Sequence, residues 1–233
     1  MTPTAHAHRL ALRAGLPHLF GLLALSVAGL AQAASFSGPV TVSLMAPGGI
    51  TSDGVTIDTT PLALTQSVPP DSAILPGVGE VGGFMLPLES IRFDGTSILV
   101  RVSQGASNGT TGYLGLGGQH ARYEFSNLNV AGQVISGMSY SLADNFGVGP
   151  GTGLNNGAAL ISSGVVKLTS PHSVVLELDQ LQFRDRGLGE SNNFADFRID
   201  LQVTAVPEPA TGAMALLGLV MLGAATRRAR PHA

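Results

Sequence analysis

Strict alternation of apolar and polar residues is the clearest pattern in the middle of the chain. Within residues 197–203 every odd position is apolar and every even position is polar. A period of two is typical of a β-strand with one buried and one exposed face. Ile98, Val100 and Val102 alternate with Leu99 and Arg101, and residues 174–179 alternate too. After residue 179 the apolar positions shift register to Leu181 and Phe183, which we interpret as a β-bulge near Gln180.

Weaker alternation predicts more strands in the central segment, residues 34–205, which we call the passenger. These strands cover residues 40–44, 55–64, 84–93, 123–130, 134–142 and 158–168. Turn dipeptides such as Asp94-Gly95 and Asn108-Gly109 separate them. No stretch of the passenger keeps a helical apolar period over three turns. We therefore predict an all-β fold, a single antiparallel β-sandwich of jelly-roll-like type with about nine or ten strands.

Two other features of the passenger bear on this prediction. Residues 65–83 and 145–157 are rich in Gly, Pro or both, and we expect long surface loops that could also form binding rims. The alternative architecture is a parallel β-helix, which would need a repeat of fixed length. The passenger shows no such repeat, so the sandwich is favoured.

The first 33 residues have the layout of a secretory signal peptide. Arg9 and Arg13 precede an uncharged apolar run over residues 19–30, and Ala31 and Ala33 form a small-x-small cleavage site for signal peptidase. The alternative is an N-terminal membrane anchor, but the apolar run is shorter than the ~20 residues that a membrane span needs. We therefore expect the mature protein to begin at Ala34.

Residues 206–233 form a second segment directed to the membrane. The tripeptide Pro207-Glu208-Pro209 precedes an apolar run over residues 212–226, and a basic group follows it. That group consists of Arg227, Arg228 and Arg230, and by the positive-inside rule it stays in the cytoplasm. As a helix the run would measure only ~22 Å, which is short for a hydrocarbon layer of ~30 Å. A short apolar tail of this kind is typical of a sorting signal that is removed.

Residues 206–230 resemble the PEP-CTERM sorting signal of exported proteins in Gram-negative bacteria. The resemblance implies that an exosortase recognises Pro207, Glu208 and Pro209 while a short transmembrane helix holds the chain transiently in the inner membrane. It further implies delivery to the cell surface or outside the cell, and a link to exopolysaccharide and biofilm. Family members often carry an aromatic residue where this chain has Gly212 and Ala213. The alternative is an ordinary single-pass anchor.

Charge and composition exclude several classes of function. The 233-residue chain has a net charge of −3, no Cys and no Trp. Without Cys, disulfides and Cys-ligated metal centres are excluded. The ends carry five of the twelve basic residues but only one of the fifteen acidic ones, so the passenger keeps seven and fourteen and has a net charge of −7. Nucleic acid is therefore not expected as a partner.

Candidate catalytic groups are sparse. The segment Gly105–Gly109 matches G-x-S-x-G, but the residues after it favour turns over the helix that a nucleophile elbow needs. Outside the two ends, His120 and His172 are the only histidines, and neither has a metal ligand at a suitable spacing. We therefore predict no catalytic residues and no cofactor.

Calcium is the best metal candidate, because it needs only oxygen ligands. Several such side chains fall between residues 185 and 196: Asp185, Glu190, Asn192, Asn193 and Asp196. Arg184 and Arg186 would neutralise part of that charge, and the spacing fits no known calcium loop. We therefore assign no metal site, although this loop remains the place to look for calcium.

The sequence thus predicts a location more sharply than an activity. Our leading hypothesis is an exported, non-enzymatic protein of the cell surface or extracellular matrix, structural or adhesive in an exopolysaccharide layer. The alternative is a carbohydrate- or calcium-dependent binding module. A hydrolase is less favoured, because no catalytic group of residues is visible and because sugar-processing sites usually have more aromatic residues.

Overall fold

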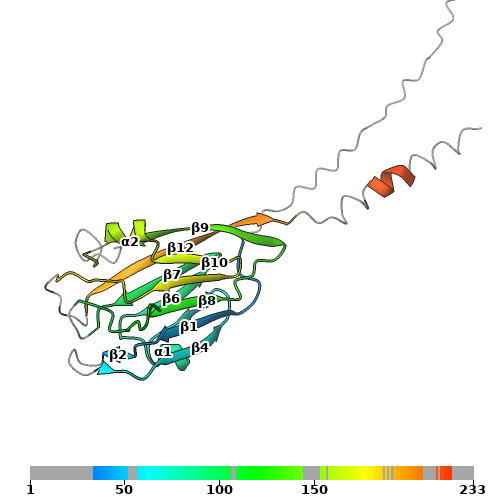
Figure 1. The fold of residues 1–233 in the computed structure, drawn as a ribbon. Helices are drawn as coiled ribbons and strands as arrows, with labels where there is room; N and C mark the ends of the chain where they lie inside the picture. Colours follow the sequence, from blue (N-terminus) through cyan, green and yellow to red (C-terminus); the bar gives the residue numbers. More distant parts are fainter. Residues whose placement is uncertain are drawn as a thin grey trace, which may run out of the picture. The chain divides into compact units, whose positions relative to one another are not determined.

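The passenger folds as two five-stranded antiparallel sheets packed face to face (Figure 1). The computed structural model describes residues 34–51, 57–105, 109–143, 153–155, 157–185, 187, 189, 192–206, 214 and 216–221. No closed barrel forms in this part of the chain. The predicted all-β sandwich is therefore confirmed.

We name each sheet after its central strand. The β8 sheet has the order β10 (Val166–Ser170), β11 (Ser173–Glu177), β8 (Arg122–Ser126), β1 (Val40–Ala46) and β4 (Leu62–Val68). The β7 sheet has the order β5 (Ala73–Ile74), β6 (Ser90–Asp94), β7 (Ser97–Ser103), β12 (Phe194–Ala205) and β9 (Gln133–Ala143). A small ribbon joins β2 (Ile50–Thr51) to β3 (Ile57–Asp58), and the helices are α1 (Gly79–Gly82) and α2 (Gly157–Ser163).

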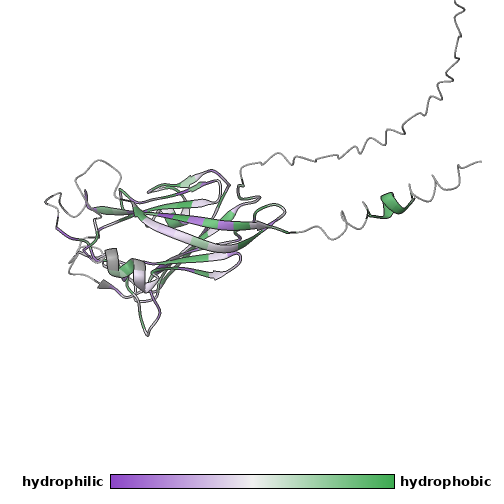
Figure 2. Cartoon of the chain, turned by 90° about the horizontal axis from the view of Figure 1, so that it is seen from above, coloured by the Kyte–Doolittle hydropathy of each residue, from purple (hydrophilic) through white to green (hydrophobic). Residues whose placement is uncertain are grey.

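The alternating residues divide between the core and the outer faces as the sequence predicts. On β12, Phe197 and Ile199 are buried, whereas the side chain of Arg198 between them is exposed. Figure 2 shows the resulting alternation of hydrophobic and hydrophilic colour along the strands. This pattern requires each sheet to bury one face and expose the other, which a two-layer sandwich achieves.

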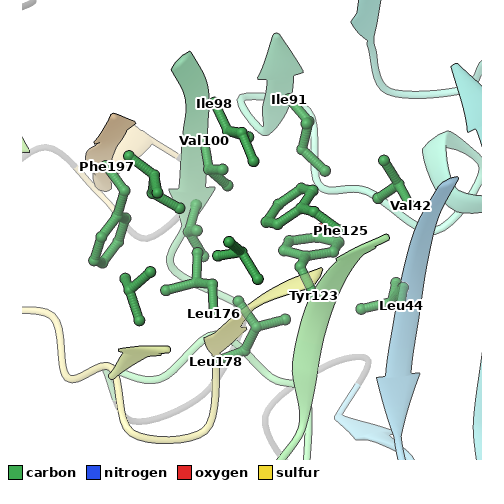
Figure 3. Packing of buried hydrophobic residues seen from close by; sticks show 14 of the residues in the cluster. Val42, Leu44, Ile91, Ile98, Val100, Tyr123, Phe125, Leu176, Leu178 and Phe197 are labelled. Atoms are coloured by element: carbon green, nitrogen blue, oxygen red, sulfur yellow. The ribbon is translucent and has the colours of Figure 1, made fainter. Parts of the chain in front are cut away.

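Apolar side chains from both sheets meet in one continuous core (Figure 3). Ile91, Ile98 and Val100 of the β7 sheet face Phe125 and Leu176 of the β8 sheet. The ring of Phe93 also contacts the ring of Phe125 across the two sheets, edge to face, with centroids 6.3 Å apart. Because edge-to-face packing suits the quadrupoles of the two rings, the pair helps to fix how the sheets meet.

The predicted strand over residues 158–168 is wrong in its first half. Residues 157–163 form α2, and β10 begins only at Val166. Gly164, with φ of +71°, ends the helix in a backbone conformation that glycine adopts readily. Helix and strand cannot be distinguished by periodicity in so short an apolar run.

The predicted loop over 65–83 and the predicted strand over 84–93 both need correction. β4 continues to Val68, and β5 and α1 follow within the expected loop. Pro87 has no N–H for a sheet ladder, and the N–H of Glu89 donates to the carbonyl of Leu86 in a turn. Strand β6 therefore starts only at Ser90.

Three other boundaries differ from prediction. The predicted strand over 55–64 is divided between β3 and β4, although residues 55 and 56 lie outside the described residues. The strand predicted over 123–130 ends at Ser126, because Asn127 has a positive φ of 58°. Most of the predicted loop over 145–157 also lies outside the described residues.

The predicted bulge near Gln180 is a turn. β11 ends at Glu177, and the N–H of Leu181 donates to the carbonyl of Leu178 over 3.2 Å. The turn lets both leucines reach the core, which accounts for the shift in the apolar pattern.

Candidate functional site

A hollow lies on the outer face of the β7 sheet, and we consider it as a candidate site. It has a volume of about 410 Å³. We call it the arginine groove, and its lining is Ala73, Leu75, Ser90, Arg92, Leu99, Val100, Arg101, Asp196, Phe197 and Arg198. Its volume falls in the range of pockets that take small ligands. Three of the seven basic residues of an acidic passenger line it.

Strand register explains how these arginines come together. Arg92 of β6 pairs with Leu99 of β7, and Leu99 pairs on its other side with Arg198 of β12. Paired residues on neighbouring strands project from the same face of the sheet. The three side chains therefore form a row, with an apolar residue between two cations. Arg101 lies two residues along β7 from Leu99 and so shares that face.

Two of the arginines are held by carboxylates. Arg101 donates from Nε and Nη2 to the two carboxylate oxygens of Asp196, over 2.8 and 3.2 Å. Its guanidinium also lies 4.0 Å from the centroid of the Phe194 ring. Arg198 donates to both carboxylate oxygens of Asp200 and to the hydroxyl of Ser97. These contacts fix the geometry of the cations while neutralising much of their charge.

Arg92 differs from its two neighbours. Its side chain is exposed, and within the described part of the chain it has neither an ion pair nor a side-chain hydrogen bond. Asp94 lies two residues along β6 on the same face but makes no ion pair with Arg92, and Asp196 and Asp200 are occupied by the other two arginines. Arg92 thus supplies the groove with a cation that makes no ion pair among the described residues.

A second group of polar residues lies inside the sandwich. Glu89 is 1% exposed and accepts hydrogen bonds from the N–H groups of Leu86 and Ser103, and its carboxyl lies within hydrogen-bond distance of the hydroxyls of Tyr113 and Tyr123. Burial raises the pKa of Glu89 to about 7, against the opposing effect of these hydrogen bonds. Burial is the main cause that raises the pKa of Tyr113 and Tyr123 well above the usual value, and a negative charge on the nearby Glu89 is the second cause.

Hydrogen-bond capacity in this buried cluster fits a protonated Glu89. Tyr113 Oη lies 3.0 Å from the carbonyl of Phe84 and 3.1 Å from Glu89 Oε2, but it has one proton to donate. If Glu89 donates to Tyr113, then Tyr113 can donate to Phe84 and both contacts are satisfied. The site is closed to solvent, so its role is in folding rather than in contact with a ligand.

A third group places His120 beside acidic residues on the β8 sheet side. Its Nδ1 lies 3.1 Å from both oxygens of Asp179, and its Nε2 lies 3.8 Å from Glu177. Lys167 donates to Glu177, and Gln180 also contacts the imidazole. This cluster could not be recognised from the sequence, because His120 lies 59 residues before Asp179. Within the described residues no hydroxyl bonds to His120, so the pair lacks the nucleophile of a hydrolase triad.

The other candidates of the sequence are not assembled into a site. Ser107 of the G-x-S-x-G segment lies outside the described residues, and residues 109–113 pass through a turn and bends to the β-bridge between Tyr113 and Ile50, without the helix that an elbow needs. His172 contacts the carbonyl of Leu128 through Nδ1 over 3.0 Å. Both observations agree with turns at these positions.

The described members of the calcium candidate point to different partners. Asp185 accepts from the N–H of Gly187, and Asp196 binds Arg101. Asn193 is buried and donates to Gln104 and to the carbonyl of Arg184. Glu190 lies outside the described residues. In the part of the chain that can be examined, no three His, Asp or Glu side chains are placed to share a metal ion.

The terminal predictions fall mostly on residues that the structure does not describe. These are Ala31 and Ala33 of the signal peptidase site, the Pro207-Glu208-Pro209 tripeptide, and Arg227, Arg228 and Arg230. Residues 216–221 are helical. Among the described helices none has both the length and the apolar character to span a membrane.

Comparison with known proteins identifies the tail. The family model for the PEP-CTERM protein-sorting motif matches residues 205–230. No curated protein and no solved structure matches the chain. The predicted resemblance is confirmed for the C-terminal segment, which marks the chain as an exported protein sorted by exosortase through the membrane to the cell surface.

Proposed function

We propose that this protein is a non-enzymatic component of the cell surface or extracellular matrix, with a structural or adhesive role in an exopolysaccharide layer. The observation that carries the proposal is the position of the sorting motif, which begins at the last residue of β12. Every residue of the apolar core precedes it, since the core cluster spans Phe36 to Leu201. Removal of the tail after the motif would therefore release a complete sandwich.

The side-chain contacts support a role without catalysis. His120, Glu177 and Asp179 engage one another and Lys167, while Glu89 is enclosed between the sheets. Catalysis of hydrolysis requires an acid, base or nucleophile that can reach a substrate. Release of new reducing ends from a polysaccharide by the purified protein would contradict this part of the proposal.

The second candidate is a binding module, and the arginine groove favours it. An exposed cation without an ion pair, beside an apolar surface, is a feature that can recognise a ligand. A protein with a purely structural role does not need it. The two candidates are compatible, because a matrix protein can be retained by binding the polysaccharide around it.

Processing and retention can be tested together in the native host. We expect mass spectrometry of the mature protein to find an N-terminus at Ala34 and to miss peptides from residues 216–227. Glu208→Ala should accumulate as an unprocessed membrane form, whereas Glu80→Ala, which removes an exposed carboxylate from α1, should be processed normally. Strains unable to make exopolysaccharide should lose the protein to the medium. Intact residues 216–227 in the mature surface protein, or equal retention without exopolysaccharide, would overturn the proposal.

A further inference from the structure

The arginine groove gathers basic residues on an acidic domain. The passenger carries a net charge of −7, yet three arginines meet at this one hollow. Asp196 and Asp200 pair with Arg101 and Arg198, which leaves Arg92 without an ion pair among the described residues, with Asp94 two residues away on the same face of β6. An exposed guanidinium without an ion pair can attract an isolated negative group, whereas the acidic surface around it repels a densely charged polyanion.

Arg92 and Arg198 are spaced to flank a small anionic group. They lie on either side of Leu99, so their backbones are separated by two strand spacings, or about 10 Å. Guanidinium groups present planar pairs of N–H donors that match a carboxylate. A ligand resting on Leu99 could therefore place its carboxylate against Arg92, with Arg198 and its bound Asp200 beside it.

The apolar part of the groove indicates what carries the carboxylate. Leu75 is 52% exposed and Leu99 is half-buried, so both present hydrocarbon to the hollow. Ser90 and the paired Asp196 add polar groups at the same place. A pyranose ring has one face of C–H groups and an edge of hydroxyls, which suits an apolar floor with polar neighbours. The volume of about 410 Å³ accommodates a short oligosaccharide segment but is too small for a long buried chain.

We propose that the arginine groove binds uronic-acid units of an anionic polysaccharide, with Arg92 as the residue that recognises the carboxylate. This inference rests on the proposed function, because it names the chemistry by which the protein would be held in the layer. Arg101, fixed between Asp196 and the Phe194 ring, acts as a wall of the site. The contact with Arg92 makes binding sensitive to salt.

The test is calorimetric titration of the purified exported protein with an oligosaccharide that carries one galacturonate unit among neutral sugars, with the methyl ester of that unit, and with a neutral oligosaccharide of equal length. We expect the acid to bind and the other two to bind at least about tenfold more weakly, as for the loss of a charge-assisted hydrogen bond. Arg92→Gln should weaken binding of the acid about tenfold. Leu75→Ser, at an exposed position, should weaken binding of the acid and of any neutral sugar alike.

Arg122→Gln is the matched control, because it removes the same charge from the outer face of the β8 sheet. It should leave binding unchanged. Equal affinity for acid and ester, equal losses in the two arginine variants, displacement of the oligosaccharide by sulfate at the same concentration, or no binding at all would overturn the assignment. A protein that fails to bind but is still retained by exopolysaccharide would refute the groove and leave the proposed function standing. Binding in vitro without retention would refute the function and leave the groove.

Discussion

Burial of Glu89 predicts an unusual dependence of stability on pH. The carboxyl is 1% exposed, and its pKa rises from 4.5 to about 7 in the folded protein. The folded state therefore keeps a proton that the unfolded state releases between these two values. Since the native state binds more protons in this window, the free energy of unfolding falls as the pH rises.

The size of the effect follows from the same two values. Each pH unit within the window changes the free energy of unfolding by at most about 1.4 kcal/mol, so the total approaches about 3 kcal/mol. The contribution of Glu89 is complete below about pH 4.5 and is lost as the pH passes about 7. This is a large fraction of the ~5–15 kcal/mol that stabilises an ordinary domain.

Glu89→Gln isolates this contribution, because the amide is neutral at every pH. The variant should lose about 1–3 kcal/mol at pH 5, since one orientation or the other of the amide leaves a buried hydrogen bond unmade. Relative to it, the wild type should be most stable at pH 5, and its advantage should shrink toward pH 8. Urea denaturation followed by far-ultraviolet circular dichroism gives the difference at each pH.

Glu124→Gln provides the control, because it makes the same chemical change at a half-exposed site on β8. That variant should keep the wild-type decline with pH. If the difference between wild type and Glu89→Gln is constant from pH 5 to pH 8, then Glu89 does not hold a proton in the folded state and the reasoning fails.

Three further variants test the packing of the fold by urea denaturation. Phe125→Ala removes a fully buried ring that contacts Phe93 across the sheets, and should destabilise by about 3–5 kcal/mol; a loss below about 1 kcal/mol would contradict the core assignment. Gly49→Ala should destabilise by about 1 kcal/mol or more, because φ is +85° and a Cβ would lie 1.7 Å from the carbonyl oxygen of Asp58, whereas the unhindered Gly38→Ala should be nearly neutral. Asp196→Asn should destabilise by about 1–3 kcal/mol by removing the charge that pairs with the partly buried Arg101, and an unchanged midpoint would show that the pair is not stabilising.

The strands that could be predicted from the sequence are those that bury one face fully. β7 and β12 are the clearest cases, because their inner residues all enter the same core. α2 could not be recognised, since its short apolar run fits a strand as well as a helix. The order of strands in each sheet could not be predicted from the sequence either. β1 pairs with β8 about eighty residues away, and the local alternation of residues does not indicate which distant strand is the partner.

The candidate site, like the fold, could be predicted from the sequence only in part. The polar positions of Arg101 and Arg198 on outward faces follow from alternation, but their meeting with Arg92 depends on the adjacency of β6, β7 and β12. The burial of Glu89 could not be predicted from the sequence, because a carboxylate before a strand is ordinarily a solvated turn residue. Only the turn at Pro87 and the two tyrosines of distant segments bring it inside. The tail, by contrast, is a linear motif, so its residues could be identified without any fold.

One strand connects the groove to the sorting motif. Arg198 and Ala205 lie seven residues apart on β12, which is about 23 Å along an extended strand. Between them, Gln202 to Ala205 remain paired with β9, and the N–H of Val206 donates to the carbonyl of Gly132. Processing beyond this point therefore breaks no contact of the groove. Glu208→Ala should change sorting while leaving uronate binding intact, and Arg92→Gln should do the reverse, because Arg92 lies on β6 and no residue of the groove belongs to the sorting motif.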